Sequence, residues 1–334
     1  MGVPLVAILG AGASRGSGEY KARLRPPLTV NLFDEDVYGE QLRLYDLAHQ
    51  AGRLIEQERS QDDALALERV LREMRESSFP HHRHMALAVP LYLQHLLYAV
   101  SVENYAQARR YDRLIERLLR LPYVCFMTLN YDVLLDRRLS GHRRLASLDD
   151  YISPEENWSL IKLHGSVNWW HPATEPFIAS APPRDLEWID SEFFCALPDM
   201  PLESIRGGPP DSSIQRYPAL AMPEGAGDRL VLPDKHRWFV NNRLKSESQI
   251  DLLVIGYSGL DTEVLSLLAS LNCKVRRMTV VNRNGIAAEQ VLTRFRAAGI
   301  DPIWPKVVLS DFAEWAGGDG LNGLVDEYDG PYSD

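Results

Sequence analysis

The chain has 334 residues, of which 45% are hydrophobic and 25% are charged, as is typical of a globular protein with a sizeable core. Its formal net charge of -10 argues against general nucleic-acid binding. The three cysteines, Cys125, Cys195 and Cys273, are too few for a four-cysteine zinc site and too far apart to suggest a disulfide framework. The N-terminus lacks the basic region of a signal peptide, and no apolar run approaches the ~20 residues of a membrane span, so we expect a cytoplasmic protein.

The first predicted element is a buried strand over residues 6–9, which runs directly into the sequence GAGAS, from Gly10 to Ser14. A short apolar run bounded by glycines is typical of a parallel strand, and the glycines permit a tight turn close to a ligand. A helix that begins near Ala13 would direct its free N–H groups into the same space, so this unit is a candidate pyrophosphate cradle. A dehydrogenase fingerprint would need a third glycine in place of Arg15, which makes a dehydrogenase the least favoured function. A purely structural strand, turn and helix remains an equal alternative.

A long basic loop is predicted over residues 15–30, followed by a helical insertion at about residues 33–120. Apolar residues recur there at helical spacing, as in Leu67, Val70 and Met74. Such stripes are typical of a core or of a subunit interface. We expect this insertion to supply the contact surface of a homo-oligomer.

Two further strands are predicted at residues 123–128 and 160–163, and both end in polar residues. The first runs into the sequence TLNYD, which starts at Thr128, and the second into His164 and Gly165. Open α/β sheets bind their ligands at the carboxyl ends of such strands. The sequence from about residue 171 to residue 233 is rich in proline and poor in periodicity, which predicts an irregular insertion.

Strands are also predicted at residues 251–255, 278–281 and 306–309, with a helix after each of the first two. The first of these strands ends in GYSG, starting at Gly256, and the second in Asn282. Alternating strands and helices predict one α/β domain over residues 1–334, built on a doubly wound, mostly parallel, Rossmann-like sheet.

Taken together and in this order, the five strand ends resemble the motifs of the Sir2 (sirtuin) family, which run GAG-x-S, T-Q-N-x-D, H-G, G-T-S and a late asparagine. The resemblance implies a Sir2-like fold with NAD+ as the substrate. It implies that His164 is the catalytic base and that Asn130 and Asp132 hold the nicotinamide ribose and carboxamide. The residues that it implies for binding the rest of NAD+ are Gly10, Ala11, Gly12, Ser14, Thr128, Gly256, Ser258 and Asn282.

Three departures narrow the resemblance within the family. There is no paired C-x-x-C, so no zinc or other metal is expected; Leu129 replaces the glutamine of T-Q-N-x-D; and residues 24–33 lack the I-P-D-F-R run. These features resemble the zinc-less Sir2-like effectors of bacterial anti-phage systems, which degrade NAD+. The implied function is an NAD+ glycohydrolase of abortive infection, restrained by self-assembly or by a separate partner such as a HerA-like ATPase or a short Argonaute.

Two other functions use the same pocket and stay open at this stage. One is an NAD-dependent protein deacylase or ADP-ribosyltransferase, and the other is a sensor that binds NAD or ADP-ribose without turnover. Each site residue also has a structural alternative, because a histidine at a strand end is commonly structural and Asn or Asp there commonly caps a helix.

Overall fold

The centre of the protein is a six-stranded sheet in which every neighbouring pair of strands is parallel. The computed structural model describes residues 2–20, 24–58, 66–153, 156–173, 194–195, 215–221 and 230–329. The strand order is β3-β2-β1-β7-β8-β9. The strands are β1 (Leu5–Leu9), β2 (Val124–Thr128), β3 (Trp158–Lys162), β7 (Gln249–Ile255), β8 (Lys274–Val281) and β9 (Trp304–Val308).

This strand order confirms the doubly wound, mostly parallel sheet expected from the sequence. The chain starts in the middle of the sheet, adds β2 and β3 on one side of β1, and returns to add β7, β8 and β9 on the other side. The direction of winding therefore reverses between β1 and β7. In sheets of this kind the reversal opens a crevice at the carboxyl ends of the two strands.

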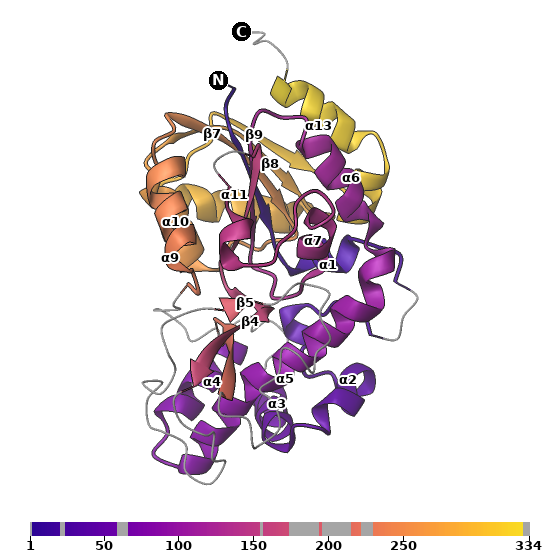
Figure 1. Cartoon of the computed structure of the whole chain (residues 1–334), viewed down its shortest axis with the longest axis vertical. Helices are drawn as coiled ribbons and strands as arrows, with labels where there is room; N and C mark the ends of the chain where they lie inside the picture. The colour runs from indigo at the N-terminus through magenta and orange to yellow at the C-terminus, as the bar shows by residue number, and fades with distance from the viewer. Residues whose placement is uncertain are drawn as a thin grey trace.

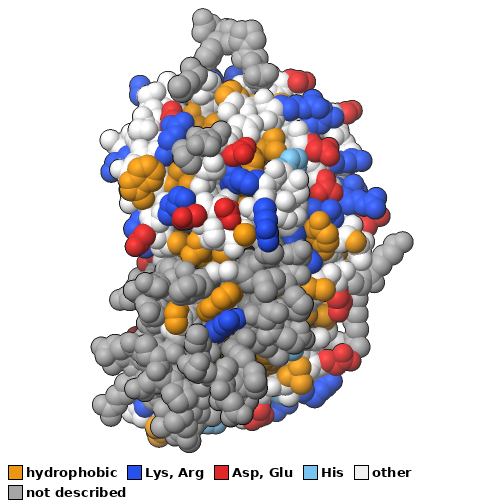
Figure 2. All heavy atoms as spheres, viewed as in Figure 1, with side chains coloured by type: hydrophobic (Ala, Val, Ile, Leu, Met, Phe, Trp, Pro, Cys, Tyr) orange, Lys and Arg blue, Asp and Glu red, His pale blue; other side chains and the backbone are white. Residues whose placement is uncertain are grey.

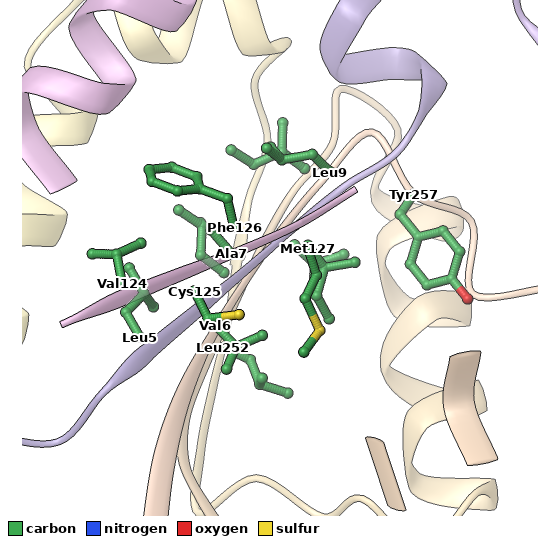
Figure 3. Packing of buried hydrophobic residues seen from close by; sticks show 14 of the residues in the cluster. Leu5, Val6, Ala7, Leu9, Val124, Cys125, Phe126, Met127, Leu252 and Tyr257 are labelled. Carbon is green, nitrogen blue, oxygen red and sulfur yellow. The ribbon is translucent and has the colours of Figure 1, made fainter. Parts of the chain in front are cut away.

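Burial explains why these short apolar runs form the central strands. Every residue of β1, β2 and β3 is buried, as expected for parallel strands that are covered on both faces. Figure 3 shows side chains of β1 and β2 on both sides of the ribbons, with Phe126 and Met127 pointing to opposite sides. β8 starts four residues earlier than predicted, because Arg276 is buried in an ion pair with Asp251 of β7.

Helices cover the sheet on both sides, and in Figure 1 α10 lies across the sheet from α6 and α13. Helix α6 packs against both α12 and α13. The helices that accompany the sheet are α1 (Ala11–Gly16), α6 (Arg109–Leu118), α7 (Leu134–Leu139), α9 (Asp234–Phe239), α10 (Thr262–Ser270), α11 (Gly285–Ala297), α12 (Phe312–Gly317) and α13 (Gly320–Asp329), with short helical turns at Leu148–Tyr151 and Val240–Leu244. Helix α1 occupies the first residues of the predicted basic loop, and residues 21–23 of that loop lie outside the described part of the chain.

Four helices form a second layer with its own apolar core, below the sheet in Figure 1. They are α2 (Glu35–Leu42), α3 (Asp46–Glu58), α4 (Ala66–Glu76) and α5 (Pro80–Asn104). The stretch Pro80–Gln107, which contains α5, is long and apolar enough to cross a membrane, but 78% of its most apolar window is buried inside the protein. The helix has no unbroken apolar run of that length, because Gln94, His95 and Ser101 interrupt it, and burial of this kind is typical of a core helix.

A small antiparallel sheet, ordered β5-β4-β6, joins the two layers. Its strands are β4 (Gly165–Ala173), β5 (Phe194–Cys195) and β6 (Gln215–Leu220). β5 and β6 fall within the stretch at 171–233 that the sequence predicts to be irregular, so that prediction was wrong for these residues. β4 pairs with partners more than 20 residues away, and such pairing leaves no local periodicity. Residues 174–193, 196–214 and 222–229 of the predicted insertion lie outside the described part.

Candidate active site

The loops that follow β1 and β7 meet at the reversal point of the sheet, and glycines allow this contact. A Cβ atom on Gly10 would lie 2.4 Å from the carbonyl oxygen of Gly256, and one on Gly12 would lie 2.8 Å from the Cα atom of Gly256. Gly256 itself has φ +62°, a backbone conformation that residues with a Cβ atom rarely adopt. The glycines of both predicted motifs therefore serve first to bring two backbone segments together.

Part of the expected phosphate cradle is engaged within the protein. The N–H of Gly12 donates to the carbonyl oxygen of Gly256 at 3.1 Å, and the N–H of Ala13 donates to that of Gly10 at 2.8 Å. Helix α1 begins at Ala11, two residues before the predicted start, and Ala11 and Gly12 are half-buried at its first turn. The backbone surface at Ala11 and Gly12 is therefore the part of the cradle that a ligand can approach.

Asn130 ties the end of β2 to the loop after β1. Its Nδ2 donates to the carbonyl oxygen of Gly10 at 3.0 Å and to Ser14 Oγ at 2.9 Å, and its side chain is almost fully buried. Thr128 adds a second link, since its Oγ1 donates to the carbonyl oxygen of Leu9 and accepts from the N–H of Asn130, each at 3.1 Å. Four of the predicted site residues therefore form one connected cluster.

Tyr111 of α6 completes this cluster, although the sequence analysis did not single it out. Its hydroxyl lies 3.0 Å from Ser14 Oγ, and the whole side chain is buried. In the sequence Tyr111 is one more apolar position of a helical stripe, and only the fold reveals that its hydroxyl reaches a strand end.

Asp132 follows Asn130 in the segment after β2 and is also buried. Its Oδ1 accepts a hydrogen bond from the N–H of Leu134 at 3.0 Å, at the start of α7. Burial raises the pKa of the Asp132 carboxyl, although the nearby Lys162 ammonium and a contact with Ser14 oppose this shift. A buried carboxyl whose pKa is raised at the end of a strand is typical of functional sites.

Lys162 of β3 contacts both Asp136 and the backbone of Asp132. Its Nζ lies 3.0 Å from Asp136 Oδ2, with both side chains completely buried, and it donates to the carbonyl oxygen of Asp132 at 2.6 Å. The hydroxyl of Tyr151 donates to the other oxygen of Asp136 at 3.0 Å. This ion pair joins β3 to α7 and fixes the backbone that carries Asp132.

His164 follows β3 and is paired with a carboxylate that the sequence did not single out. Its Nε2 lies 2.7 Å from Oδ2 of Asp261, and the two side chains are only 18% and 13% exposed. The other oxygen of Asp261 accepts from the N–H of Val264 at 2.9 Å, so Asp261 also caps α10. Burial favours a higher pKa for Asp261, but the hydrogen bond and the charge of His164, together with backbone N–H donors, lower it. In the sequence, Asp261 is recognisable only as an aspartate just before a predicted helix, a position typical of a helix N-cap.

Two predicted residues lie apart from these contacts. The side chain of Ser258 is exposed, and its carbonyl oxygen accepts from Arg294 at 2.6 Å. Asn282 follows β8, one strand beyond β7, and its Oδ1 accepts from the N–H of Asn284 at 2.9 Å. Among the described residues, neither side chain contacts the cluster around Asn130 or the pair of His164 and Asp261.

A cavity of about 440 Å³ lies away from the strand ends, between α2 and α3 of the helical layer. The polar residues that line it include Glu35, which contacts both His49 and Arg53. In the described part of the chain, no group of three or more His, Cys, Asp or Glu side chains could hold a metal ion.

The sequence matches no protein-family model and no curated protein. Its structural neighbours are Sir2 homologues. A mutant Sir2 homologue in complex with 2'-O-acetyl ADP-ribose is 15% identical, covers 99% of this chain and 95% of its own, and gives a TM-score of 0.42. A Sir2 homologue in complex with NAD is 15% identical over 97% of this chain and 90% of its own, with a TM-score of 0.40. A mutant Sir2 homologue with ADP-ribose is 13% identical over 97% and 92%, with a TM-score of 0.43. Similarity at this level transfers no residue roles to this chain.

Proposed function

We propose that this protein is a Sir2-like NAD+ glycohydrolase, which cleaves NAD+ to nicotinamide and ADP-ribose. The observation that supports this most is the connected cluster of Gly10, Ser14, Thr128 and Asn130 at the reversal point of the sheet. These are motif residues of the Sir2 resemblance, and they meet where doubly wound sheets bind nucleotides. The buried pair of His164 and Asp261 supplies a base next to the end of β3.

Cleavage of the bond between nicotinamide and ribose suits a site of this composition. The ribosyl carbon becomes cation-like as the bond breaks, as in glycoside hydrolysis. Nicotinamide leaves as a neutral molecule from a cationic ring, so it needs no strong general acid. Water then adds to the ribosyl carbon and yields ADP-ribose and a proton. The site must therefore fix the cofactor, exclude competing acceptors and receive that proton.

The contacts suggest a role for each of the three catalytic candidates. His164 takes the proton from water or from a ribose hydroxyl. Asp132 holds the carboxamide, and its raised pKa suits hydrogen bonding to a neutral amide. Nδ2 of Asn130 is already bonded to Gly10 and Ser14. We therefore expect Asn130 to fix the loop after β1 and to present its Oδ1 to the ribose or to the water.

Incubation of the purified protein with NAD+ and chromatography of the products test this proposal. We expect nicotinamide and ADP-ribose from the parent protein and a rate lower by about 10² to 10⁴-fold in His164→Ala, because the general base is lost. His142→Ala, at an exposed histidine after α7, is the matched control and should keep the parent's rate.

Other outcomes would favour the other functions. Turnover by His164→Ala at the parent's rate would contradict the role of this residue. Formation of acyl-ADP-ribose with an acylated peptide would indicate a deacylase. Thermal stabilisation by NAD+ without turnover would indicate a sensor.

We also propose a biological setting, since uncontrolled loss of NAD+ would harm the cell that makes this protein. In this proposal the chain is one cytoplasmic Sir2-like domain with insertions at 33–120 and 171–233, and it acts as the effector of an anti-phage system. A homo-oligomer formed through α2 to α5, or a partner such as a HerA-like ATPase or a short Argonaute, would restrain it. Measurement of the mass in solution, with and without residues of α3 and α4 changed, tests the homo-oligomer.

A further inference from the structure

We propose that Asp261 is a positioning residue for His164, which holds Nε2 of the imidazole so that Nδ1 is the nitrogen that takes the proton. The reaction served by this pair rests on the function proposed above. The pair itself is a property of the fold and can be tested without turnover.

The geometry of Asp261 is that of an anchored carboxylate. One oxygen accepts from the N–H of Val264 at 2.9 Å, and the other lies 2.7 Å from Nε2 of His164. Both side chains are largely buried, so water competes little with this hydrogen bond. The backbone of His164 is fixed as well, because its carbonyl oxygen accepts from the N–H of Ala221 at 2.9 Å. Asp261 therefore cannot turn away from His164 without also releasing the N–H of Val264.

The position of the pair in the fold connects it with the candidate site. His164 follows β3 and Asp261 follows β7, and the sheet places β2 and β1 between these strands. Strands three positions apart lie roughly 14 Å from each other, so the two segments must converge over the carboxyl end of the sheet. The ends of β1 and β2 in this interval carry Gly10 and Asn130. The pair therefore lies beside the loops proposed to hold NAD+.

The pairing decides which ring nitrogen is available for chemistry. With Nε2–H donating to the carboxylate, the neutral imidazole carries its lone pair on Nδ1. Within the described part of the chain, Nδ1 of His164 has no hydrogen-bond partner. When Nδ1 takes a proton from water or from a ribose hydroxyl, the O–H bond breaks and the Asp261 carboxylate stabilises the imidazolium that forms.

Two other side chains that lie near His164 are those of Tyr131 and Glu263. The ring of Tyr131 lies 6.0 Å from the imidazole, centre to centre, and is neutral near pH 7. Glu263 of α10 accepts from the N–H of Leu230, next to Val231, which forms an isolated bridge with His164. Asp261 is the carboxylate in direct contact, so its replacement should dominate any change in the hydrogen bonding of the His164 ring.

The first test is nitrogen NMR of the full chain with labelled histidine, which reports the tautomer of the neutral ring. Asp261→Asn keeps an acceptor for the N–H of Val264 but places an amide NH2 where Oδ2 faces Nε2 of His164. We expect the Nε2–H tautomer of His164 in the parent and the Nδ1–H tautomer in Asp261→Asn, because Nε2 must then accept from the amide. The resonance is assigned with His164→Ala. Asp311→Asn is the matched control, because Asp311 caps α12 in the same way, at 2.8 Å from the N–H of Glu314, and is exposed. An unchanged tautomer of His164 in Asp261→Asn would overturn the proposal.

The second test separates positioning from a purely structural role. In Asp261→Asn we expect kcat for NAD+ cleavage to fall by about 10 to 10³-fold with little change in KM, and the acidic limb of the pH profile to move to lower pH. Asp261→Glu should recover part of the lost rate. A changed tautomer with an unchanged kcat and pH profile would overturn the positioning role. A parent protein that never cleaves NAD+ would instead contradict the proposed function, and the NMR measurement would still decide whether Asp261 fixes the tautomer of His164.

Discussion

At the scale of single residues, the site depends on glycines that fit a backbone contact. Gly256 occupies a left-handed conformation, and a Cβ atom there would lie 2.3 Å from the backbone nitrogen of Ala13 and 2.5 Å from the carbonyl carbon of Gly12. All of these atoms belong to the main chain, so no side chain can move aside to make room. The contact between the two loops is therefore incompatible with any larger residue at this position.

Replacement of Gly256 by alanine tests this contact. We expect Gly256→Ala to lower the free energy of unfolding by about 2 to 5 kcal/mol, from the strain of the positive φ together with the clash. Gly299→Ala is the matched control, since Gly299 has φ +84° but a Cβ there meets nothing within 4 Å. It should cost only about 1 kcal/mol. Urea unfolding of both variants measures the difference, and equal losses would show that the loop contact contributes nothing.

The sequence revealed the residues that carry their own local signal. Glycines after an apolar run, and polar residues at a strand end, can be recognised from the sequence alone, and Gly10, Asn130 and His164 were predicted as site residues in this way. Asp261 was not found because its partner lies 97 residues away and its cap at a helix start is a sufficient local explanation. Tyr111 and Lys162 were hidden for the same reason, since each looks like part of an ordinary helix or strand.

At the scale of elements, the buried ion pair of Lys162 and Asp136 joins β3 to α7. Neither side chain is exposed, and Tyr151 satisfies the second oxygen of the carboxylate. Burial of a charge is costly unless it is paired and hydrogen-bonded. Removal of one partner therefore costs more than the pair itself contributes, because it leaves an isolated charge in the core.

We expect Lys162→Met to lower the free energy of unfolding by about 3 to 5 kcal/mol. Lys306→Met is the matched control, because Lys306 pairs with Glu327 where both side chains are nearly half exposed. Its loss should be below about 1 kcal/mol. Chemical unfolding of the two variants gives the comparison. A small loss in Lys162→Met would contradict the expected cost of an unpaired buried charge.

The parallel strands were predicted to within a few residues, whereas the small antiparallel sheet was not. Each parallel strand is a short apolar run, so its burial can be read from composition. β4 carries Trp169, Trp170, His171 and Pro172 in succession and has no alternation of apolar and polar residues. Its partner β6 lies in a stretch whose prolines and glycines suggest irregular structure. Pairing between distant segments decides this sheet, and a single sequence does not display such pairing.

At the scale of the whole molecule, buried histidine links pH to stability. His236 of α9 is completely buried, contacts the rings of Tyr151 and Trp169, and lies 3.2 Å from the carbonyl oxygen of Leu148. Burial lowers the pKa of His236 from 6.5 to about 4. The unfolded chain therefore binds a proton at this residue between these two values, and the folded chain does not. Stability contributed by the neutral ring is present above pH 6.5 and is lost as the pH falls toward 4.

This difference predicts a stability loss of about 2 kcal/mol between pH 7 and pH 5 that depends on His236. The variant His236→Gln keeps a donor for the carbonyl oxygen of Leu148 but cannot titrate. It should lose about 2 kcal/mol less than the parent over the same interval, as measured by urea unfolding at the two pH values. Identical pH dependence in parent and variant would show that the buried ring does not control acid stability.

The described surface in Figure 2 carries acidic and basic side chains in close mixture over the part that contains the sheet. Fields of mixed sign cancel over short distances, so this face exerts little attraction on a polyanion. Recognition by this face would therefore depend on shape and on individual contacts.

The position of β1 between β2 and β7 also has a consequence for the order of events during synthesis. β1 is made before its partner β7, which follows about 250 residues later; at ~5–20 residues per second this is a delay of roughly 10 to 50 s. During this time one edge of β1 has no partner strand. The loop at Gly10 acquires its neighbour Gly256 only after this delay. A nascent chain that ends before β7 therefore cannot bring these two loops together, and the activity proposed above toward NAD+ would require β7 to have been made.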